Sequence, residues 1–153
     1  MDLNLKPVCK LSVQVAPPVE IGQTETGRKR IIPIIGGLVE GERITGTILN
    51  LGADWQTIHD NGTAELDTRY VIKTDDGANI DIRNWGFRVC TPEVQARIAQ
   101  GESVDVSDYT MITTPRFETA SPDYLWLNNG IFVARCERHP DAVRVNIYEV
   151  VTP

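Results

Sequence analysis

The stretch from Glu65 to Arg88, ELDTRYVIKTDDGANIDIRNWGFR, constrains the fold more than any other part of the chain. At its centre, Asp75-Asp76-Gly77 is a strong turn signal. A three-residue hairpin loop is usually a type I turn followed by one left-handed residue, a position that glycine takes without strain. With these residues as the loop, Thr74 pairs with Ala78. The sequence therefore predicts a β-hairpin, and a two-residue loop is disfavoured because it would mix apolar and polar side chains on each face.

The two faces of this hairpin differ because side chains alternate across a strand. The apolar face carries Leu66, Thr68, Tyr70, Ile72, Ala78, Ile80 and Ile82. The polar face carries Glu65, Asp67, Arg69, Val71, Lys73, Asn79, Asp81, Arg83 and Trp85. Two interpretations of the polar face stay open. It is either a solvated outer face with diagonal ion pairs, such as Asp67 with Arg83 and Lys73 with Asp81, or the polar lining of a barrel interior that binds a ligand.

Length and charge limit the class of protein. A chain of 153 residues fits one domain, over residues 1–153, with a sizeable core. A net charge of −6 and a pI near 4.9 argue against nucleic-acid binding, which needs a basic surface. We expect a cytoplasmic protein without membrane contact, because no apolar run spans a bilayer and the N-terminus lacks a signal-peptide apolar region. Three widely spaced cysteines and two histidines predict free thiols and no metal site.

The order of alternating segments and turns predicts an all-β fold of about nine or ten strands with one short α-helix, as in a barrel or sandwich. The helix is expected over residues 92–100. Thr91 is suited to the N-cap, Pro92 to the first helical position and Gly101 to the C-terminal stop. Its apolar stripe is expected to comprise Val94, Ile98 and Ala99.

Two other segments are harder to assign. Pro33 cannot donate to a ladder, so its segment is an edge strand, a bulged strand or an extended loop. Residues 115–122 are expected to form a turn. The segment from Tyr124 to Arg135 contains Asn129-Gly130, which suits a two-residue hairpin turn. We favour one long strand with a bulge at Gly130, because the arms of such a hairpin would be very short.

Several motifs, in order along nearly the whole chain, resemble the DUF3237 family, also called UPF0311. They are GRKRIIPIIGG from Gly27, GTIL from Gly46, GADWQ from Gly52, ELDTRY from Glu65, KTDDGA from Lys73, TTPRFET from Thr113 and YLWLN from Tyr124. The resemblance implies an antiparallel β-barrel of calycin-like architecture. Some relatives in natural-product biosynthesis look like cofactor-free catalysts of ring closure, such as intramolecular addition of a hydroxyl to an alkene. The chain departs from the family pattern at Asn129-Gly130 and at Met111-Ile112.

With that resemblance, the polar hairpin face becomes a candidate catalytic site. Ring closure needs an acid and a base, and we expect Asp54 and Asp67 to supply them, with Arg69 keeping one carboxylate ionised. Which carboxyl is the acid is left open. The candidate substrate-binding residues are Trp55, Tyr70, Arg83, Glu118, Tyr124, Trp126 and Asn128. Each candidate also has a structural interpretation, as a surface ion pair, a turn residue or a core aromatic.

Two functions follow. The first is a cofactor-independent cyclase, lyase or isomerase that acts on a hydrophobic aromatic or polyketide-like small molecule. The alternative is a calycin-type protein that binds or carries such a molecule without turnover. Neither function calls for a metal or cofactor, and self-association through an exposed edge such as the Pro33 segment would give a homo-oligomer.

Overall fold

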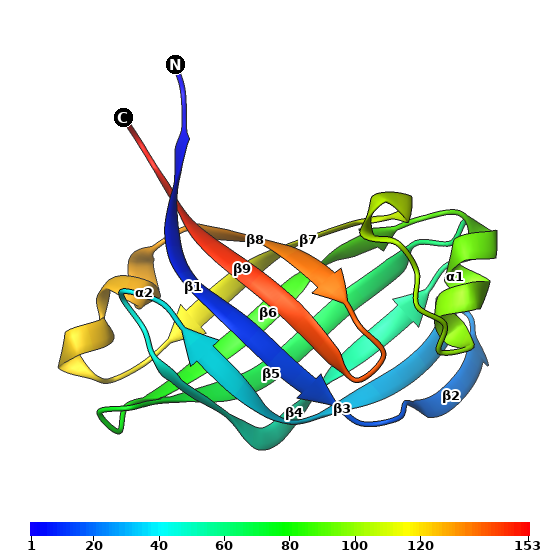
Figure 1. Cartoon of the computed structure of the whole chain (residues 1–153), viewed down its shortest axis with the longest axis horizontal. Helices are drawn as coiled ribbons and strands as arrows, with labels where there is room; N and C mark the ends of the chain where they lie inside the picture. Colours follow the sequence, from blue (N-terminus) through cyan, green and yellow to red (C-terminus); the bar gives the residue numbers. More distant parts are fainter.

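The computed structural model describes residues 1–153, which form a closed eight-stranded antiparallel β-barrel with one additional strand (Figure 1). The strands are β1 (Asn4–Val15), β2 (Val19–Thr24), β3 (Gly27–Glu40), β4 (Gly46–Ile58), β5 (Ala64–Thr74), β6 (Asn79–Val89), β7 (Thr110–Glu118), β8 (Phe132–Arg138) and β9 (Ala142–Val151). Their order in the sheet is β1-β9-β8-β7-β6-β5-β4-β3-β2. The expectation of an all-β antiparallel barrel of about nine or ten strands is confirmed.

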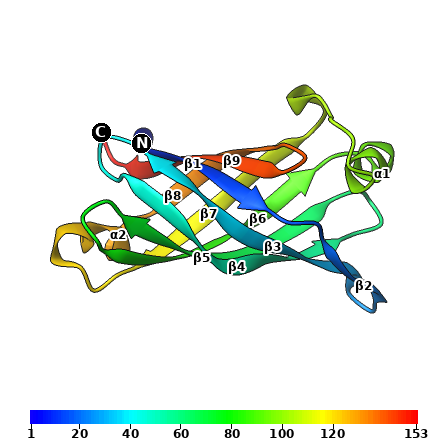
Figure 2. The same cartoon turned by 60° about the horizontal axis from the view of Figure 1, so that its bottom comes forward.

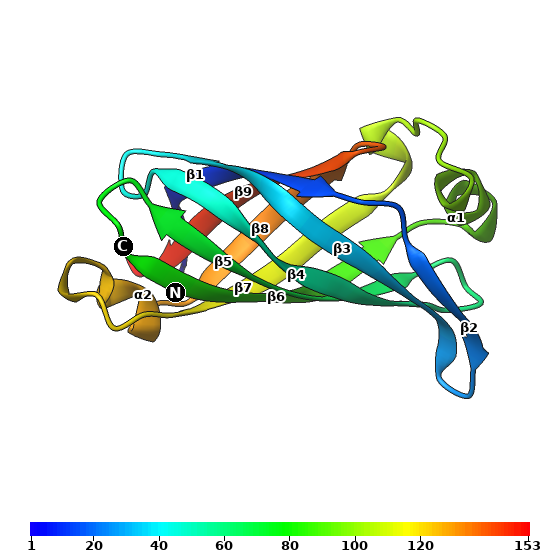
Figure 3. The ribbon, with the colours of Figure 1, turned by 90° about the horizontal axis from the view of Figure 1, so that it is seen from below.

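The barrel closes where β1 pairs with the second half of β3. Gly37 lies opposite Val13 in this pairing, and a Cβ atom at Gly37 would overlap the carbonyl oxygen of Ser12. Only glycine therefore allows the two backbones to approach closely enough to close the sheet. The register of β3 against β4 shifts between Pro33 and Gly37, so the bulged strand is the correct alternative for this segment. Strand β2 pairs with the first half of β3 and extends beyond one end of the barrel (Figure 3).

The hairpin β5–β6 has the predicted loop and register. The backbone N–H of Thr74 donates to the carbonyl of Ala78 at 2.9 Å, and Gly77 has a φ of +92°. The apolar face points into the barrel, where Ile72, Ile80 and Ile82 belong to the core. The polar face points outward, which confirms the interpretation as a solvated surface.

On that outer face, Arg83 pairs with Asp67 at 3.3 Å, as expected. Asp81 pairs with Arg69 at 3.6 Å and not with the expected Lys73.

Helix α1 (Pro92–Ala99) covers one end of the barrel (Figures 1 and 2). Its expected cap is confirmed, because the side chain of Thr91 accepts a hydrogen bond from the backbone N–H of Val94 at 3.2 Å. The buried residues of the helix are Gln95 and Ile98, whereas Ala99 is exposed. The inward face is therefore partly polar, unlike the expected apolar stripe.

The expectation of one long strand over residues 124–135 is wrong. A 3-10 helix at Pro122–Tyr124 and the short helix α2 (Trp126–Asn129) lie at the end of the barrel opposite α1 (Figure 2). Asn128 explains the helical turn, because its side chain accepts from the backbone N–H of Thr119 at 2.8 Å and donates to the carbonyl of Thr119 at 2.9 Å. A further 3-10 helix spans Val106–Asp108.

The expected turn over residues 115–122 is also wrong in its first part, since β7 continues through Pro115 to Glu118. Strand β8 pairs with β7 only at Ile112 and Thr113. The rest of β7 is therefore an edge on that side, and an edge tolerates a proline that cannot donate. None of the helices is long and apolar enough to cross a membrane.

Candidate functional site

The barrel contains a cavity of about 370 Å³ that opens at the end covered by α1. One part of its wall is apolar and comes from Val13, Ile34, Leu66 and Val145. Another part is polar and comes from strands β3 to β6, where Arg30, Asp54, Gln56, Tyr70, Asn84 and Arg88 reach the cavity. Ile98 of α1 and the residues that connect β8 to β9 complete the lining at the open end.

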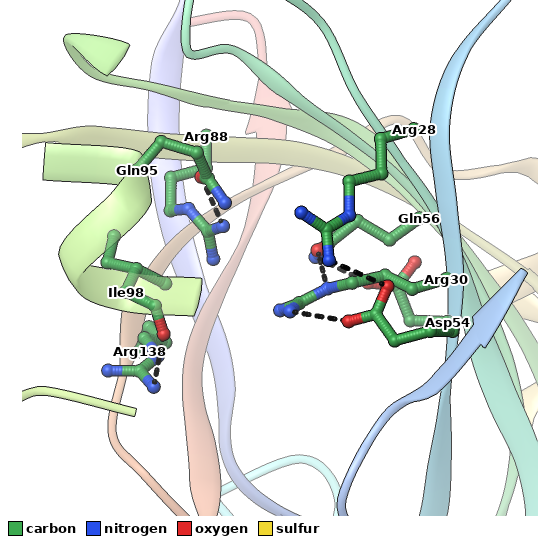
Figure 4. A network of polar contacts seen from close by, with 9 residues as sticks. Arg28, Arg30, Asp54, Gln56, Arg88, Gln95, Ile98 and Arg138 are labelled. Atoms are coloured by element: carbon green, nitrogen blue, oxygen red, sulfur yellow. Dashed lines mark hydrogen bonds and ion pairs between the residues drawn. The ribbon is translucent and has the colours of Figure 1, made fainter. Parts of the chain in front are cut away.

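Strand β4 places Asp54 and Gln56 side by side, because residues two apart share one face of a strand. The amide nitrogen of Gln56 donates to Oδ2 of Asp54 at 3.2 Å, and Nε of Arg30 donates to Oε1 of Gln56 at 2.8 Å. All three side chains are buried. Figure 4 shows this group on one side of the cavity. The amide of Gln56 thus connects a carboxyl group to a guanidinium without direct contact between them.

Asp54 is the one buried carboxylic acid of the chain, with 9% of the residue exposed. Burial raises its pKa from 3.8 to about 6, because the charged form loses its hydration. Hydrogen bonds from the backbone of Asp67 and from the side chains of Thr68 and Gln56 lower the pKa in part, as does the more distant charge of Arg88. The carboxyl group can therefore exchange a proton near neutral pH.

A second group faces this one across the cavity (Figure 4). Arg88 of β6 is 2% exposed, and its Nη2 donates to Oε1 of Gln95 on α1 at 2.8 Å. Arg138, at the end of β8, donates to the backbone carbonyls of Glu102 and Ile98 at 2.7 and 3.3 Å. These contacts hold the C-terminal end of α1 over the barrel. They also bring two more guanidinium groups to the cavity.

Several buried polar atoms around the cavity have no hydrogen-bond partner in the protein. They are the hydroxyl of Tyr70, Oδ1 of Asn84 and Nε of Arg88, which belong to lining residues, and Nε2 of Gln95, which lies behind the lining as the partner of Arg88. Buried polar groups are nearly always hydrogen-bonded, and an unpaired one costs about 1–3 kcal/mol. Their concentration around one cavity is typical of a site built to bind a polar ligand.

Of the residues that the sequence indicated, Asp54 and Tyr70 line this cavity. Asp67, Arg69 and Arg83 lie on the outer face of the hairpin, so the interpretation of that face as a barrel lining is wrong. The reason is that the apolar face of the same hairpin supplies the core, and a strand can turn only one face inward. Trp55, next to Asp54 on β4, is 50% exposed and also points outward.

The other four predicted residues are not at the cavity. Glu118 is exposed near the end of β7. Tyr124, Trp126 and Asn128 belong to the helical segment at the opposite end of the barrel, where the guanidinium of Arg43 lies 3.7 Å from the ring centre of Trp126. The structure therefore brings Asp54 and Tyr70 together and separates them from the remaining candidates. The catalytic role of Asp54 stays a prediction.

Sequence reasoning missed Arg30, Gln56, Asn84, Arg88 and Gln95. A signal for two of them was present, because Asn84 and Arg88 continue the inward face of β6 that begins with Ile80 and Ile82. A charged residue at a core-facing position is rare unless it is paired or functional.

The cysteines of this region are poor nucleophiles. Cys136 lines the cavity, and burial raises the pKa of its thiol to about 11. The chain also brings together no group of three or more histidine, cysteine or carboxylate side chains that could hold a metal ion.

The fold and the site define a closed antiparallel β-barrel with an internal cavity that is partly polar and partly apolar. The chain belongs to the family described as "Protein of unknown function (DUF3237)", whose sequence profile matches residues 3–150. It is 39% identical over 149 residues to a UPF0311 protein of Rhodopseudomonas palustris, with 97% of each chain covered. The crystal structure of a conserved Rhodopseudomonas palustris protein of unknown function superposes with a TM-score of 0.92 at 38% identity and covers 99% of both chains.

Two more similar proteins extend the comparison. A β-barrel-like protein from Acinetobacter baumannii has a TM-score of 0.87 at 42% identity, covering 99% of this chain and 98% of the other. A hydroalkoxylation enzyme of Penicillium herquei is 26% identical over 126 residues, which are 82% of this chain and 69% of that protein. The crystal structure of an enzyme from Penicillium herquei shares the fold, with a TM-score of 0.74 at 21% identity over 99% of this chain and 96% of the other.

Proposed function

We propose that this protein catalyses a cofactor-independent ring closure, the intramolecular addition of a hydroxyl group to an alkene, on a hydrophobic aromatic or polyketide-like molecule. The observation that carries the proposal is Asp54, a buried carboxyl group with a pKa of about 6 on the wall of a partly apolar cavity. The distant similarity to a hydroalkoxylation enzyme supports the same chemistry.

In this reaction, the protonated carboxyl of Asp54 gives its proton to one alkene carbon. The hydroxyl oxygen of the same molecule forms a bond to the other alkene carbon and loses its proton to the Asp54 carboxylate. One C–O bond and one C–H bond form, one O–H bond and the alkene π bond break, and Asp54 returns to its starting state. With a pKa of about 6, roughly a tenth of Asp54 is protonated at pH 7, so a usable fraction of the acid form is present.

The neighbours of Asp54 hold its two oxygens in fixed directions. Oδ1 accepts from the backbone N–H of Asp67 at 3.0 Å, and Oδ2 accepts from Gln56. Fixed acids and bases act efficiently because no reorganisation is needed when the proton moves. The apolar wall contributed by Ile34, Leu66 and Val145 would bind the hydrophobic body of the substrate and exclude water.

A direct test uses ortho-prenylphenol, which would cyclise to a dimethylchroman, with product measured by chromatography. The wild-type protein and the Asp67→Asn variant should form the product, because the side chain of Asp67 lies outside the barrel and its backbone N–H remains. The Asp54→Asn variant should lose the activity. In deuterium oxide, the product should carry one deuterium on the carbon that receives the proton. Loss of activity in Asp67→Asn with retention in Asp54→Asn would overturn the assignment of Asp54.

One observation favours the alternative, a protein that binds a small molecule without turnover. The second carboxyl of the expected acid–base pair, Asp67, is outside the cavity, so Asp54 alone would have to perform both proton transfers. Saturable binding of ortho-prenylphenol without product at any pH from 5 to 8 would support this carrier function and overturn the enzymatic one.

A further inference from the structure

The cavity concentrates positive charge in a protein whose net charge is −6. Three arginines line it, Arg30, Arg88 and Arg138, and they come from three different strands. Two carboxylic acids also line it. One is Asp54, and the other is Asp141, which is exposed at the rim and forms no salt bridge. Because the remainder of the protein is acidic, this local excess of cations is a specific feature of the site.

The three guanidinium groups are bound mainly by neutral partners. Arg88 donates to the amide oxygen of Gln95, and Arg138 donates to two backbone carbonyls. Neither of them forms a salt bridge within the chain, and Arg30 has only the exposed Glu20 at 3.9 Å. A buried guanidinium that serves stability alone is normally paired with a carboxylate, because an uncompensated buried charge is costly.

Arg88 also has capacity left for a ligand. Its Nε is buried and has no hydrogen-bond partner in the protein. The pKa of Arg88 is lowered to about 10, mainly by burial; the charges of Arg30 and Arg138 act in the same direction, and Cys90 and Asp54 oppose them. The guanidinium therefore stays protonated at neutral pH, although its charged form is disfavoured by desolvation and by repulsion from Arg30 and Arg138. An anion at this position would relieve both effects.

We infer that the ligand of this cavity has an apolar body and one anionic oxygen group, and that Arg88, with Arg30 and Arg138, binds this group at the α1 end. The inference names the class of substrate for the proposed function and so rests on the cavity being the substrate site. The planar fork of an arginine matches carboxylate and phenolate oxygens and forms strong charge-assisted hydrogen bonds. Val13, Ile34 and Leu66 would contact the apolar body.

The size of the cavity agrees with this class. A volume of about 370 Å³ lies near the lower end of the range for small-molecule sites, which is roughly 300–1,000 Å³. An aromatic molecule of two or three rings with one acidic group is therefore the appropriate probe.

The test compares two fluorescent probes with nearly the same aromatic framework, anilinonaphthalene sulfonate, which is anionic, and phenylnaphthylamine, which is neutral. The Arg88→Met variant should bind the sulfonate roughly tenfold more weakly or worse, because a charge-assisted contact is lost, and should bind the neutral probe at least as well. The control is Arg116→Met, which removes the same charge from the exposed face of β7 and should change neither affinity.

Arg138→Met is the second variant and keeps the test possible if Arg88→Met does not fold. Arg138 is only half-buried, so its replacement should disturb the fold less. It should weaken binding of the sulfonate and not of the neutral probe. Unchanged affinity for the sulfonate in the folded arginine variants, or an equal loss for both probes, would overturn the inference.

Displacement experiments separate the two sources of an anionic oxygen. Displacement of the sulfonate by naphthoate indicates a carboxylate ligand, and displacement by dinitronaphthol, which is ionised at neutral pH, indicates an acidic hydroxyl. Equally strong displacement by the neutral naphthamide would contradict both. These binding and displacement assays do not depend on whether the protein turns over a substrate. If ortho-prenylphenol is cyclised but the arginine variants bind both probes normally, the proposed function stands and this inference fails. If the sulfonate is recognised without any cyclisation, the inference stands and the enzymatic proposal fails.

Discussion

Asp54 and Asp67 are joined by a hydrogen bond, but the donor is the backbone N–H of Asp67, which lies 3.0 Å from Oδ1 of Asp54. The carboxylate of Asp67 itself points away from the barrel and pairs with Arg83. Two carboxyl groups on neighbouring strands therefore lie on opposite sides of the barrel wall. Only the carboxyl of Asp54 can act on a molecule in the cavity.

The buried state of Asp54 predicts a pH-dependent contribution to stability. Its pKa is raised from 3.8 to about 6 in the folded protein, so the unfolded chain gives up this proton at lower pH than the folded chain does. The folded state is therefore penalised progressively from about pH 4 to pH 6, and the full penalty, on the order of 3 kcal/mol, is present above pH 6. Acidification from pH 7 to pH 4 should remove it.

The Asp54→Asn variant isolates this contribution, because asparagine does not titrate. The difference in unfolding free energy between wild type and variant, measured with urea at several pH values, should shift in favour of the wild type as the pH falls from 7 to 4. A difference that stays constant over this range would show that Asp54 is not desolvated in the folded protein.

Gln95 is expected to stabilise the end of the barrel through Arg88. It is 5% exposed, and its Oε1 accepts from Nη2 of Arg88 at 2.8 Å. Gln95→Ala should lower the unfolding free energy by about 1–3 kcal/mol, because a buried charged donor loses its partner. The control is Gln100→Ala on the exposed C-terminal end of the same helix, for which we expect a change within about 0.5 kcal/mol. Equal effects of the two substitutions in urea unfolding would contradict the structural role of the contact.

The register of the central hairpin could be predicted because its determinants are local. A turn that contains Gly77 fixes the pairing of Thr74 with Ala78, and side-chain alternation then fixes both faces. The choice of which face lines the barrel also followed from the sequence in principle, since the apolar face must be buried. The charges of the polar face suggested a catalytic site, but charged residues at alternating positions of a strand are usually solvated.

The cavity itself depends on long-range packing. Arg30, Asp54 and Arg88 are polar residues at inward positions of three strands, and only closure of the barrel brings them to one space. The helical segment around Trp126 was missed for a similar reason. Its composition favours a strand, but the side chain of Asn128 binds both backbone groups of Thr119 and fixes a helical turn.

Trp126 should contribute to stability and not to ligand binding. Its ring lies under the guanidinium of Arg43, at 3.7 Å, and its centre is 6.3 Å from that of Phe132, at the end of the barrel away from the cavity. Trp126→Ala should lower the unfolding free energy by about 1–3 kcal/mol through lost packing and a lost cation–π contact. The affinity for anilinonaphthalene sulfonate should not change. A selective loss of that affinity in a variant of normal stability would place the ligand at the α2 end.

Tyr70, unlike Trp126, should contribute to ligand binding at a cost in stability. Its hydroxyl is buried, lines the cavity and has no hydrogen-bond partner in the protein, while burial raises its pKa and keeps it a neutral donor. Tyr70→Phe removes an unpaired buried polar group and should therefore raise the unfolding free energy by about 1 kcal/mol. If the hydroxyl binds the ligand, the same change should lower kcat/KM for ortho-prenylphenol roughly tenfold, as expected for one lost hydrogen bond.

The matched control for Tyr70→Phe is Tyr109→Phe. The hydroxyl of Tyr109 is already satisfied, because it accepts from the backbone N–H of Arg138 at 2.9 Å. Its removal should lower stability by about 1 kcal/mol, opposite in sign to the effect at Tyr70. Unfolding curves and cyclisation rates for the two variants therefore separate a hydroxyl kept for function from one kept for structure. A loss of stability in Tyr70→Phe with unchanged turnover would exclude Tyr70 from the site. A hydroxyl kept for function at the expense of stability should, when removed, raise the unfolding free energy and lower kcat/KM.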